Sequence, residues 1–326
     1  MVPDSRAGQP AVVCLGEVLV DFVALDTSVP LEQATTFHRA AGGAPANVAV
    51  ALARLGKRSS FIGKIGSDPF GRWLRQTLAA EGVDLRGLVE DVAARTPLAF
   101  VGSDGQGGRS FVFYHAGMAD TLLGADELDN ALLANCSVFH FGSVTLAAEP
   151  SATATIAAAH AARAGGSLVS FDPNVRLEVW DSPRRALERM VDALRLVDVV
   201  KVSSDELEFL AGTTDPAEAC RRLRAHGPAL AVVTLGADGC YFDSACGAGH
   251  VPGVRVTPVD SLGAGDAFVA GLLAGISAQP GAAVLQDQDA LRSTLRFANA
   301  VGAITTTQYG AIPALPTRAQ VERLLS

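Results

Sequence analysis

The feature that most constrains the fold of this chain is a repeated alternation between short apolar runs and amphipathic stretches rich in Ala and Leu. Apolar runs of strand length that alternate with helical stretches are typical of βαβ units, in which helices cover both faces of a mostly parallel sheet. We therefore predict an α/β fold with a doubly wound, mostly parallel sheet. The apolar runs are 12–20, 61–65, 138–141, 168–171, 197–202 and 230–235, and the helical stretches are 46–55, 152–164, 183–196, 216–226, 267–276 and 291–303.

Two segments, 17–24 and 97–114, break this alternation because they have the pattern of extended chain without an intervening helix. The second contains the sequence Ser-Asp-Gly-Gln-Gly-Gly at 103–108, whose Gly and Asp content predicts a hairpin turn. We interpret the two segments as a small β appendage on the α/β body. Since no linker or internal repeat divides the chain, we expect residues 1–326 to form a single domain.

Composition and charge narrow the classes of function. The formal net charge of the 326 residues is −8 at pH 7, which argues against nucleic acid as a partner because phosphate backbones are bound mainly by clustered Lys and Arg. No run is long enough to cross a bilayer, and residues 1–10 lack the apolar centre of a signal peptide, so we predict a cytoplasmic protein without a membrane partner. Dispersed cysteines predict free thiols and neither a disulfide framework nor a zinc site; they are Cys14, Cys136, Cys220, Cys240 and Cys246.

The strongest local signal is the loop 260–266, Asp-Ser-Leu-Gly-Ala-Gly-Asp, which precedes an apolar helix. The backbone N–H groups of Gly263, Ala264 and Gly265 can converge at the start of that helix and stabilise the negative charge of a transferred phosphoryl group. Asp266, in the first helical turn, then stands where a general base for an alcohol is needed. The alternative is that Asp266 only caps the helix. Neither a P-loop nor a dinucleotide fingerprint is found in the sequence.

A second Gly-rich turn predicts a place for a polar ligand. Gly42 and Gly43 permit close approach of the backbone, and Asn47, in the first turn of the helix that follows, offers a donor and acceptors for paired hydroxyls. Asp21 interrupts an apolar strand and shares a face with Leu19, where a carboxylate is costly without partners. The alternatives are an ordinary loop-to-helix junction and a charge that protects an edge strand.

Three further places have a plain structural interpretation beside a functional one. Arg176 follows a predicted strand at the sheet edge where α/β proteins bind ligands, but it also suits a surface turn. Ser203 and Glu206 have the spacing of a capping box. The residues 234–239 have the pattern of a hairpin turn between two strands.

The Gly-rich signatures 41–56 and 260–274 together resemble those of the ribokinase-like (pfkB) family of carbohydrate and nucleoside kinases. The resemblance extends over nearly the whole chain and is strongest to fructokinases. It rests on the stretches 16–21, 42–47, 139–143, 171–176, 201–210 and 297–299, together with Pro316 and Thr317.

The resemblance implies a doubly wound α/β domain with a β-sheet lid, formed from about 17–40 and 97–115. It implies that Asp266 is the catalytic base and that Gly263, Ala264 and Gly265 form the anion hole. The residues implied to hold the sugar are Asp21, Gly42, Gly43, Asn47, Arg176 and Asp266. Those implied on the ATP side are Ser203, Thr234, Gly236, Gly239, Gly265 and Asn299. Glu206 is implied to organise Mg²⁺ through water, and Asp260 and Gly310 a monovalent cation such as K⁺.

The implied activity is transfer of the γ-phosphate of ATP to D-fructose, giving fructose 6-phosphate. Three residues depart from the family pattern: Leu262 replaces the usual Thr near the cation site, Ser203 replaces Asn, and His115 replaces the Arg of fructokinases. Other kinases of the family, acting on 2-keto-3-deoxygluconate, ribose or a nucleoside, therefore stay open. Alternatives from other classes are a sugar-binding regulator without catalysis and a nicotinamide oxidoreductase. We also expect a homodimer that associates through the lid.

Overall fold

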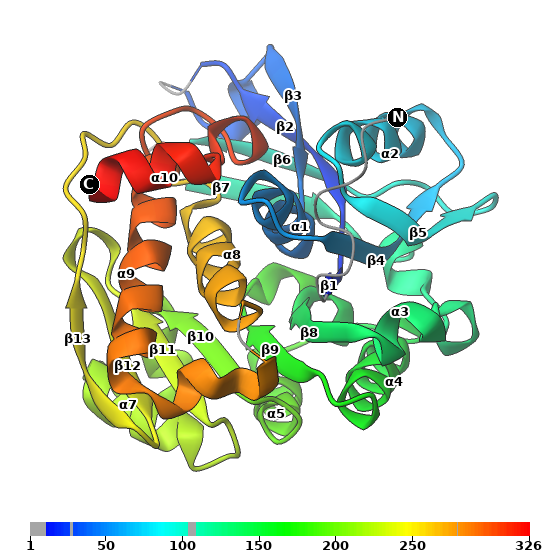
Figure 1. Ribbon diagram of the computed structural model, residues 1–326. Coiled ribbons are helices and arrows are strands. Elements are labelled where there is room, and N and C mark those ends of the chain that lie inside the picture. Colours follow the sequence, from blue (N-terminus) through cyan, green and yellow to red (C-terminus); the bar gives the residue numbers. More distant parts are fainter. Residues whose placement is uncertain (1–10, 27–28, 104–108, 279) are drawn as a thin grey trace, which may run out of the picture.

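The computed structural model describes residues 11–26, 29–103, 109–278 and 280–326, and a nine-stranded sheet forms the centre of this part (Figure 1). Its strands are β1 (Ala11–Leu15), β4 (Ser59–Gly66), β5 (Asp84–Asp91), β8 (Cys136–Gly142), β9 (Leu168–Asp172), β10 (Val199–Ser203), β11 (Leu230–Thr234), β12 (Gly239–Ser244) and β13 (Gly247–Pro252). Their order is β13-β12-β11-β10-β9-β8-β1-β4-β5. Only the pairs β11–β12 and β12–β13 are antiparallel, so the predicted mostly parallel sheet is confirmed for the described residues.

Helices cover both faces of this sheet, as the alternation predicts. Along β1, Val12 and Cys14 belong to one buried cluster and Val13 and Leu15 to the other, because successive side chains of a strand point to opposite faces. The first cluster packs against α1 (Ala44–Arg54), α2 (Pro69–Ala80), α8 (Ala264–Ile276), α9 (Gln288–Thr305) and α10 (Arg318–Leu325). The second packs against α3 (Asn130–Ala134), α4 (Ser151–Ala164), α5 (Pro183–Leu194), α6 (Leu207–Ala211) and α7 (Pro216–Arg224). The five cysteines are free thiols, as predicted.

A separate four-stranded sheet forms the lid and lies across one end of the body in Figure 1. Its strands are β2 (Leu19–Ala24), β3 (Phe37–Gly42), β6 (Leu98–Ser103) and β7 (Arg109–Tyr114), in the order β3-β2-β6-β7. The predicted lid is therefore confirmed, and β6 and β7 pair as an antiparallel hairpin. The turn residues 104–108 lie outside the described part of the chain. Since β2 is flanked by β3 and β6, the interpretation of Asp21 as an edge-strand charge is wrong.

The apolar run 12–20, which we expected to be one strand, is divided between the two sheets. β1 ends at Leu15, and the chain turns at Gly16 before β2 begins at Leu19. A side chain on Gly16 would overlap the ring of Pro45, so the turn passes against the start of α1. The run appears continuous in sequence because residues on both sides of the turn are buried. The structure also contains α2, β5 and α10, which the sequence analysis does not predict.

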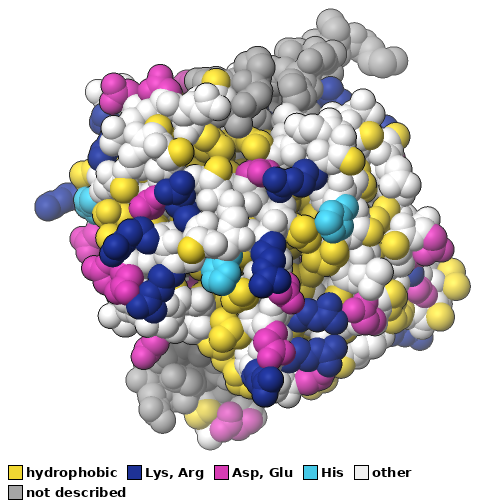
Figure 2. All heavy atoms as spheres, turned by 90° about the horizontal axis from the view of Figure 1, so that it is seen from below, with side chains coloured by type: hydrophobic (Ala, Val, Ile, Leu, Met, Phe, Trp, Pro, Cys, Tyr) yellow, Lys and Arg dark blue, Asp and Glu magenta, His cyan; other side chains and the backbone are white. Residues whose placement is uncertain are grey.

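The face seen in Figure 2 carries basic and acidic side chains side by side. Along α5, Arg184 pairs with Glu188, and Arg185 pairs with Asp181. These opposite charges neutralise one another locally. In the described ranges, no helix is both long enough and apolar enough to cross a membrane.

Candidate active site

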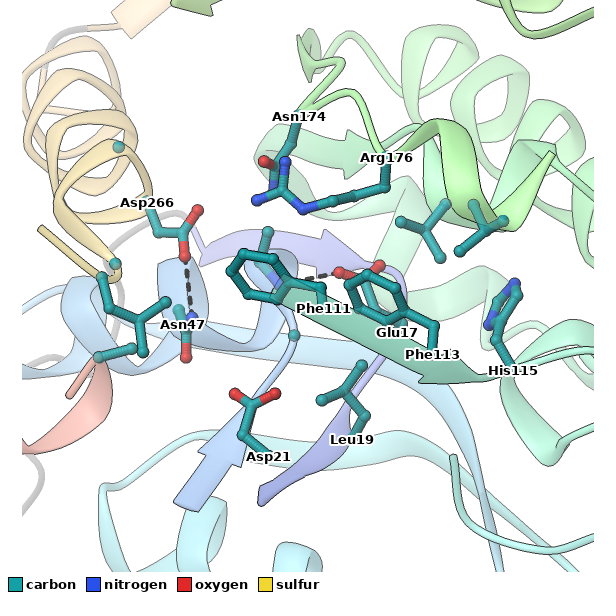
Figure 3. Close-up of a pocket in the computed structure, with 18 of the residues that line it drawn as sticks. Glu17, Leu19, Asp21, Asn47, Phe111, Phe113, His115, Asn174, Arg176 and Asp266 are labelled. Carbon is teal, nitrogen blue, oxygen red and sulfur yellow. Dashed lines mark hydrogen bonds between the residues drawn. The ribbon is translucent and has the colours of Figure 1, made fainter. Parts of the chain in front are cut away.

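A cavity of about 440 Å³ lies between the lid and the carboxyl ends of the central strands (Figure 3). The lid contributes Leu19 from β2 and Phe111 and Phe113 from β7 to its wall. On the other face of β7, Val112 and Tyr114 are 43% and 53% exposed, as the alternation of side chains along a strand requires. One face of the lid therefore closes the cavity and the opposite face meets solvent.

Asp266 reaches the cavity from the first turn of α8 (Figure 3). The amide Nδ2 of Asn47, in α1, donates a hydrogen bond of 2.8 Å to its Oδ2. Burial raises the pKa of the Asp266 carboxyl to about 6, although the hydrogen bond from Asn47 and the charge of Lys201 oppose this shift. A carboxylate that is desolvated, held in place and still ionised at neutral pH is suited to accept a proton.

The loop before α8 presents backbone donors beside this carboxylate. Gly263 precedes the helix with a φ of 77°, and a Cβ at this position would lie 2.8 Å from the Cβ of Ala311. The Ala264 amide donates to the Ser261 carbonyl at 3.2 Å. Among the described residues, the amides of Gly265 and Asp266 have no acceptor, as is usual for the first turn of a helix. An anion placed here would meet these two donors and the positive end of the α8 dipole.

Asp21 faces the same cavity from the lid. Gly42 makes room for it, because a side chain on Gly42 would overlap the Asp21 carboxylate. Burial raises the pKa of Asp21 to about 7, with a further increase from Asp266, whereas Arg176 lowers it. Burial in this cavity therefore raises the pKa of both Asp21 and Asp266.

Arg176 extends into the cavity from the loop after β9. Its Nη1 donates to the Val175 carbonyl at 2.9 Å, and its guanidinium lies 6.0 Å from the centre of the Phe111 ring. Asn174, in the same loop, has a φ of 40°, and its amide donates to the Asp172 carboxylate at 3.1 Å. The Asp-Pro-Asn turn thus directs Arg176 towards the lid. The predicted sugar-side residues Asp21, Gly43, Asn47, Arg176 and Asp266 all line this one cavity, with Gly42 behind Asp21.

The sequence analysis did not single out Glu17, which also lines the cavity. Its Oε1 accepts a hydrogen bond of 2.8 Å from the Ala44 amide at the start of α1, and its Oε2 is buried without a partner among the described residues. Burial raises the pKa of Glu17 to about 7. Further along the wall, His115 Nδ1 donates to the buried Asp120 carboxylate at 2.7 Å. A carboxylate inside the apolar run 12–20 was the sequence signal that could have pointed to Glu17.

Two charged residues at the ends of adjacent strands were also missed. Lys201 Nζ donates to the Asp172 carboxylate at 3.0 Å, and both residues are buried. Lys201 lines the cavity, and its pKa is raised because the neighbouring carboxylates outweigh the effect of its burial. A lysine inside the apolar run 197–202 was the signal that could have found it.

Of the residues expected on the ATP side, only Gly265 lines this cavity. Ser203 and Thr234 are neighbours on β10 and β11. Gly236 and Gly239 flank the turn into β12, so the predicted hairpin is confirmed. Asn299, on α9, donates through Nδ2 to the carbonyls of Val251 and Pro252, both at 3.1 Å. The first four residues thus surround the carboxyl ends of neighbouring strands, while Asn299 joins α9 to β13.

The residues expected near cations are held by backbone amides. Glu206 accepts hydrogen bonds from Ser203 at 2.7 Å and from Val175 at 2.6 Å, which confirms its capping interaction with Ser203. Asp260 accepts from Leu262 at 3.0 Å and from Gly310 at 2.9 Å. Glu206 therefore links the Arg176 loop to the start of α6, and Asp260 links the loop before α8 to the segment after α9.

Comparisons with known proteins agree with this architecture. Residues 9–318 match the pfkB family of carbohydrate kinases. The probable fructokinase-7 of Arabidopsis thaliana is 45% identical over 99% of this chain and 94% of that relative, and fructokinase-1 of Zea mays is 46% identical over 98% of both chains. Two solved structures show the same fold. Fructokinase from Xylella fastidiosa with bound ATP has a TM-score of 0.89 at 38% identity, covering 97% of this chain and 98% of its own. A fructokinase double mutant from Vibrio cholerae O395, in fructose, ADP and potassium ion bound form, has a TM-score of 0.87 at 38% identity, covering 98% and 99%. This chain belongs to the pfkB family of carbohydrate kinases.

Proposed function

We propose that this protein is a fructokinase, which transfers the γ-phosphate of ATP to the 6-hydroxyl of D-fructose. The observation that carries the proposal is the Asp266 carboxylate beside the free amides of the α8 N-terminus, at one end of a closed polar cavity. The fructokinase assignment within the family is supported by full-length relatives at about 45% identity. A regulator without catalysis would need neither the base nor the amides, and family membership argues against an oxidoreductase.

The residues divide the reaction between them. Asp266 accepts the proton of the sugar hydroxyl as its oxygen attacks the γ-phosphorus, and the bond to the ADP oxygen breaks. The amides of Gly265 and Asp266 stabilise the charge that develops on the transferred group. Asn47 positions Asp266, while Asp21 supplies acceptors for sugar hydroxyls from the lid. The apolar rings of Phe111 and Phe113 line the cavity from the lid and limit the access of water to the reacting groups.

The far end of the cavity supports a neutral sugar as substrate. Glu17 lines this end of the cavity, and its Oε2 has no hydrogen-bond partner among the described residues, which suits a sugar hydroxyl as a partner. Asp120 does not line the cavity, because its carboxylate is bonded to His115, and the carboxyl groups that an acidic sugar would meet there include those of Asp21 and Asp266. Arg176 has the opposite charge, but this charge already acts on the carboxyl groups of Asp21 and Asp266, whose pKa values it lowers. We therefore favour fructose over 2-keto-3-deoxygluconate.

The test is ADP release measured over a panel of D-fructose, ribose, 2-keto-3-deoxygluconate and adenosine. We expect kcat/KM to be highest for D-fructose. A tenfold preference for another member of the panel would overturn the choice of sugar, and no ADP release with any of them would overturn the kinase assignment.

For the nucleotide we propose Ser203, Thr234, Gly236, Gly239 and Asn299 as neighbours of ATP. The carboxyl ends of parallel strands are where open α/β sheets bind ligands, and the positive φ values of Gly236 and Gly239 let the backbone approach closely. Asn299 fits this role only indirectly, because its side-chain amide donates to two carbonyls of β13.

For cations we propose that Glu206 contributes to a Mg²⁺ site through water. Both of its oxygens accept amide hydrogen bonds, which leaves lone pairs for water but disfavours direct coordination. Bound Mg²⁺ would neutralise phosphate charge. K⁺ would be held near Asp260 by carbonyl oxygens, since the contact with Gly310 is made by an N–H group, which is not a cation ligand.

We also propose a homodimer of this single-domain chain through the outer face of the lid. That face carries Phe22 stacked on Phe100 and the exposed side chains of Val112 and Tyr114. Apolar and aromatic side chains of this kind are typical of the centre of a protein interface. Size-exclusion chromatography with light scattering should give twice the mass of the 33.6 kDa chain, and Tyr114→Glu should give the monomer. A monomeric wild type would contradict the proposal.

Replacing sugar-side residues should affect the sugar and not ATP. Asp21→Ala removes hydrogen bonds to hydroxyls, and Asn47→Ala removes a partner for hydroxyls together with the donor that holds Asp266, a loss of about 1–3 kcal/mol when a partner is left unpaired. We expect the sugar KM to rise about tenfold or more, with the ATP KM changed little. Steady-state kinetics with each substrate varied in turn provides the measurement. An unchanged sugar KM in both variants would place the sugar elsewhere.

The pH dependence follows from the raised pKa of Asp266. A base must be unprotonated, and a carboxyl with a pKa of about 6 is protonated below that value. We expect kcat/KM to fall about tenfold for each pH unit below 6, at a higher pH than an ordinary carboxyl would produce. A profile that stays level down to pH 4.5 would show that this carboxyl does not titrate in the reaction.

A further inference from the structure

The mechanism above leaves one buried charge of the cavity wall without a role. Lys201, in the middle of β10, is 6% exposed, and its ammonium group is bonded to Asp172 at the end of β9. A buried lysine is costly unless it is paired, and a paired one could be replaced by apolar residues without loss of stability. Its position in the wall of the cavity suggests a use there.

The ammonium group lies directly against the loop that carries the base. A Cβ built on Gly265 would be 3.1 Å from Lys201 Nζ, and Asp266 is the next residue. Asp172 holds the ammonium at this place from the neighbouring strand. The nearby His140 is buried beside Ser170, and burial and the charge of Lys201 lower its pKa to about 3, so it is neutral. The ammonium group of Lys201 therefore places a fixed positive charge directly against the loop that carries Asp266.

We propose that Lys201 is a further positioning residue of the phosphoryl transfer, whose fixed positive charge keeps the Asp266 carboxylate ionised across the Gly265 backbone. The proposal rests on the proposed kinase function, because it assigns Asp266 the role of base. Burial and the carboxylates around Asp266 favour its protonated form, and a nearby cation opposes them. The groups that act on Asp266 from the surrounding elements are Asn47 on α1, Asp21 on β2, Asp172 on β9, Arg176 after β9 and Lys201 on β10.

Two substitutions should shift the acidic limb of the pH profile, the pH range in which kcat/KM falls as Asp266 is protonated, in opposite directions. Lys201→Gln keeps a donor for Asp172 but removes the positive charge. The acidic limb should therefore shift to higher pH by about one pH unit. Asp172→Asn removes a negative charge and leaves the lysine, so the limb should move to lower pH. At pH 6 the ionised fraction of the base falls from about one half to about one tenth, so the activity of Lys201→Gln should be about fivefold lower than that of the wild type.

Lys64→Gln is the matched control. Lys64, on β4, is also a buried lysine, and it pairs with Asp91 at 3.1 Å and Glu127 at 2.9 Å, outside the cavity. The Lys64→Gln variant should have a lower melting temperature, while the acidic limb of its kcat/KM profile stays at the wild-type pH. Loss of a buried ion pair alone therefore predicts no shift of the acidic limb. Opposite shifts in Lys201→Gln and Asp172→Asn would not be a consequence of general destabilisation.

Carbon-13 NMR of the Asp266 carboxyl, assigned by the loss of its signal in Asp266→Asn, gives a second readout that needs no activity. Absence of kinase activity in the wild type would overturn the proposed function, whereas the NMR titration would still test the effect of Lys201. An Asp266 titration unchanged in both Lys201→Gln and Asp172→Asn would overturn the proposal. If Lys201→Gln does not fold, Lys201→Met, which keeps the length of the side chain but not its charge, takes its place in the same titration, and an unchanged Asp266 pKa in that variant would overturn the proposal.

Discussion

Asp266→Asn should lower kcat by two to four orders of magnitude. The amide is nearly isosteric with the carboxylate but cannot accept the proton of the sugar hydroxyl, and general-base catalysis is typically worth about 10²–10⁴-fold. The backbone amides of the α8 N-terminus survive the change, so ATP affinity should stay within about threefold. Single-turnover phosphoryl transfer, together with equilibrium binding of ATP, separates the two effects.

The melting temperature provides the control for this variant. Asn at 266 has no charge to desolvate, so the buried site should lose no stability beyond the altered bond to Asn47. A folded Asp266→Asn protein that keeps more than about a tenth of the wild-type kcat would exclude Asp266 as the base.

Gly263→Ala should have the next largest effect, about 10²–10³-fold on kcat. The residue has a φ of 77°, and its new Cβ would lie 2.8 Å from that of Ala311, so the loop has to move. Displacing amides that face a transferred anion costs about as much as removing one oxyanion-hole donor. Steady-state kinetics at saturating sugar and ATP measures this loss.

Gly56→Ala is the matched control, because it separates backbone strain from the position of the loop. Gly56 has a φ of 80°, but no atom lies within 4 Å of a Cβ built there. Both variants should lose about 1–2 kcal/mol of unfolding free energy from the left-handed backbone, and only Gly263→Ala should lose activity. Equal losses of kcat in Gly263→Ala and Gly56→Ala would show that the backbone amides of the loop before α8 do not act in catalysis.

Much of the fold could be predicted because the sequence carries it locally. Apolar runs and amphipathic stretches are properties of neighbouring residues, and the helices 152–164 and 267–276 appear in the structure as α4 and α8. The division of the run 12–20 could not be predicted in this way. It depends on Gly16 passing against Pro45, a contact between residues far apart in sequence.

The site residues that follow Gly-rich loops could be predicted from the sequence. Those whose position in the site depends on tertiary packing could not. Asp266 and Asn47 stand beside glycines that mark a turn before a helix. Glu17 and Lys201 belong to apolar runs, where a single charged residue has many explanations. Only the three-dimensional structure shows that Lys201 is held by Asp172 and that an oxygen of Glu17 is left unpaired.

The strand order has a consequence for how the chain acquires its activity during synthesis. β1 lies between β8 and β4, so the first strand made is flanked on both sides only after residue 142 has left the ribosome. The bond between Asn47 and Asp266 spans 219 residues, and such distant contacts are slow to form because a long loop must first close. A nascent chain that lacks α8 therefore contains the residues of the lid and of part of the cavity wall, but not the base Asp266. Catalytic competence should emerge abruptly, when the last fifth of the polypeptide docks.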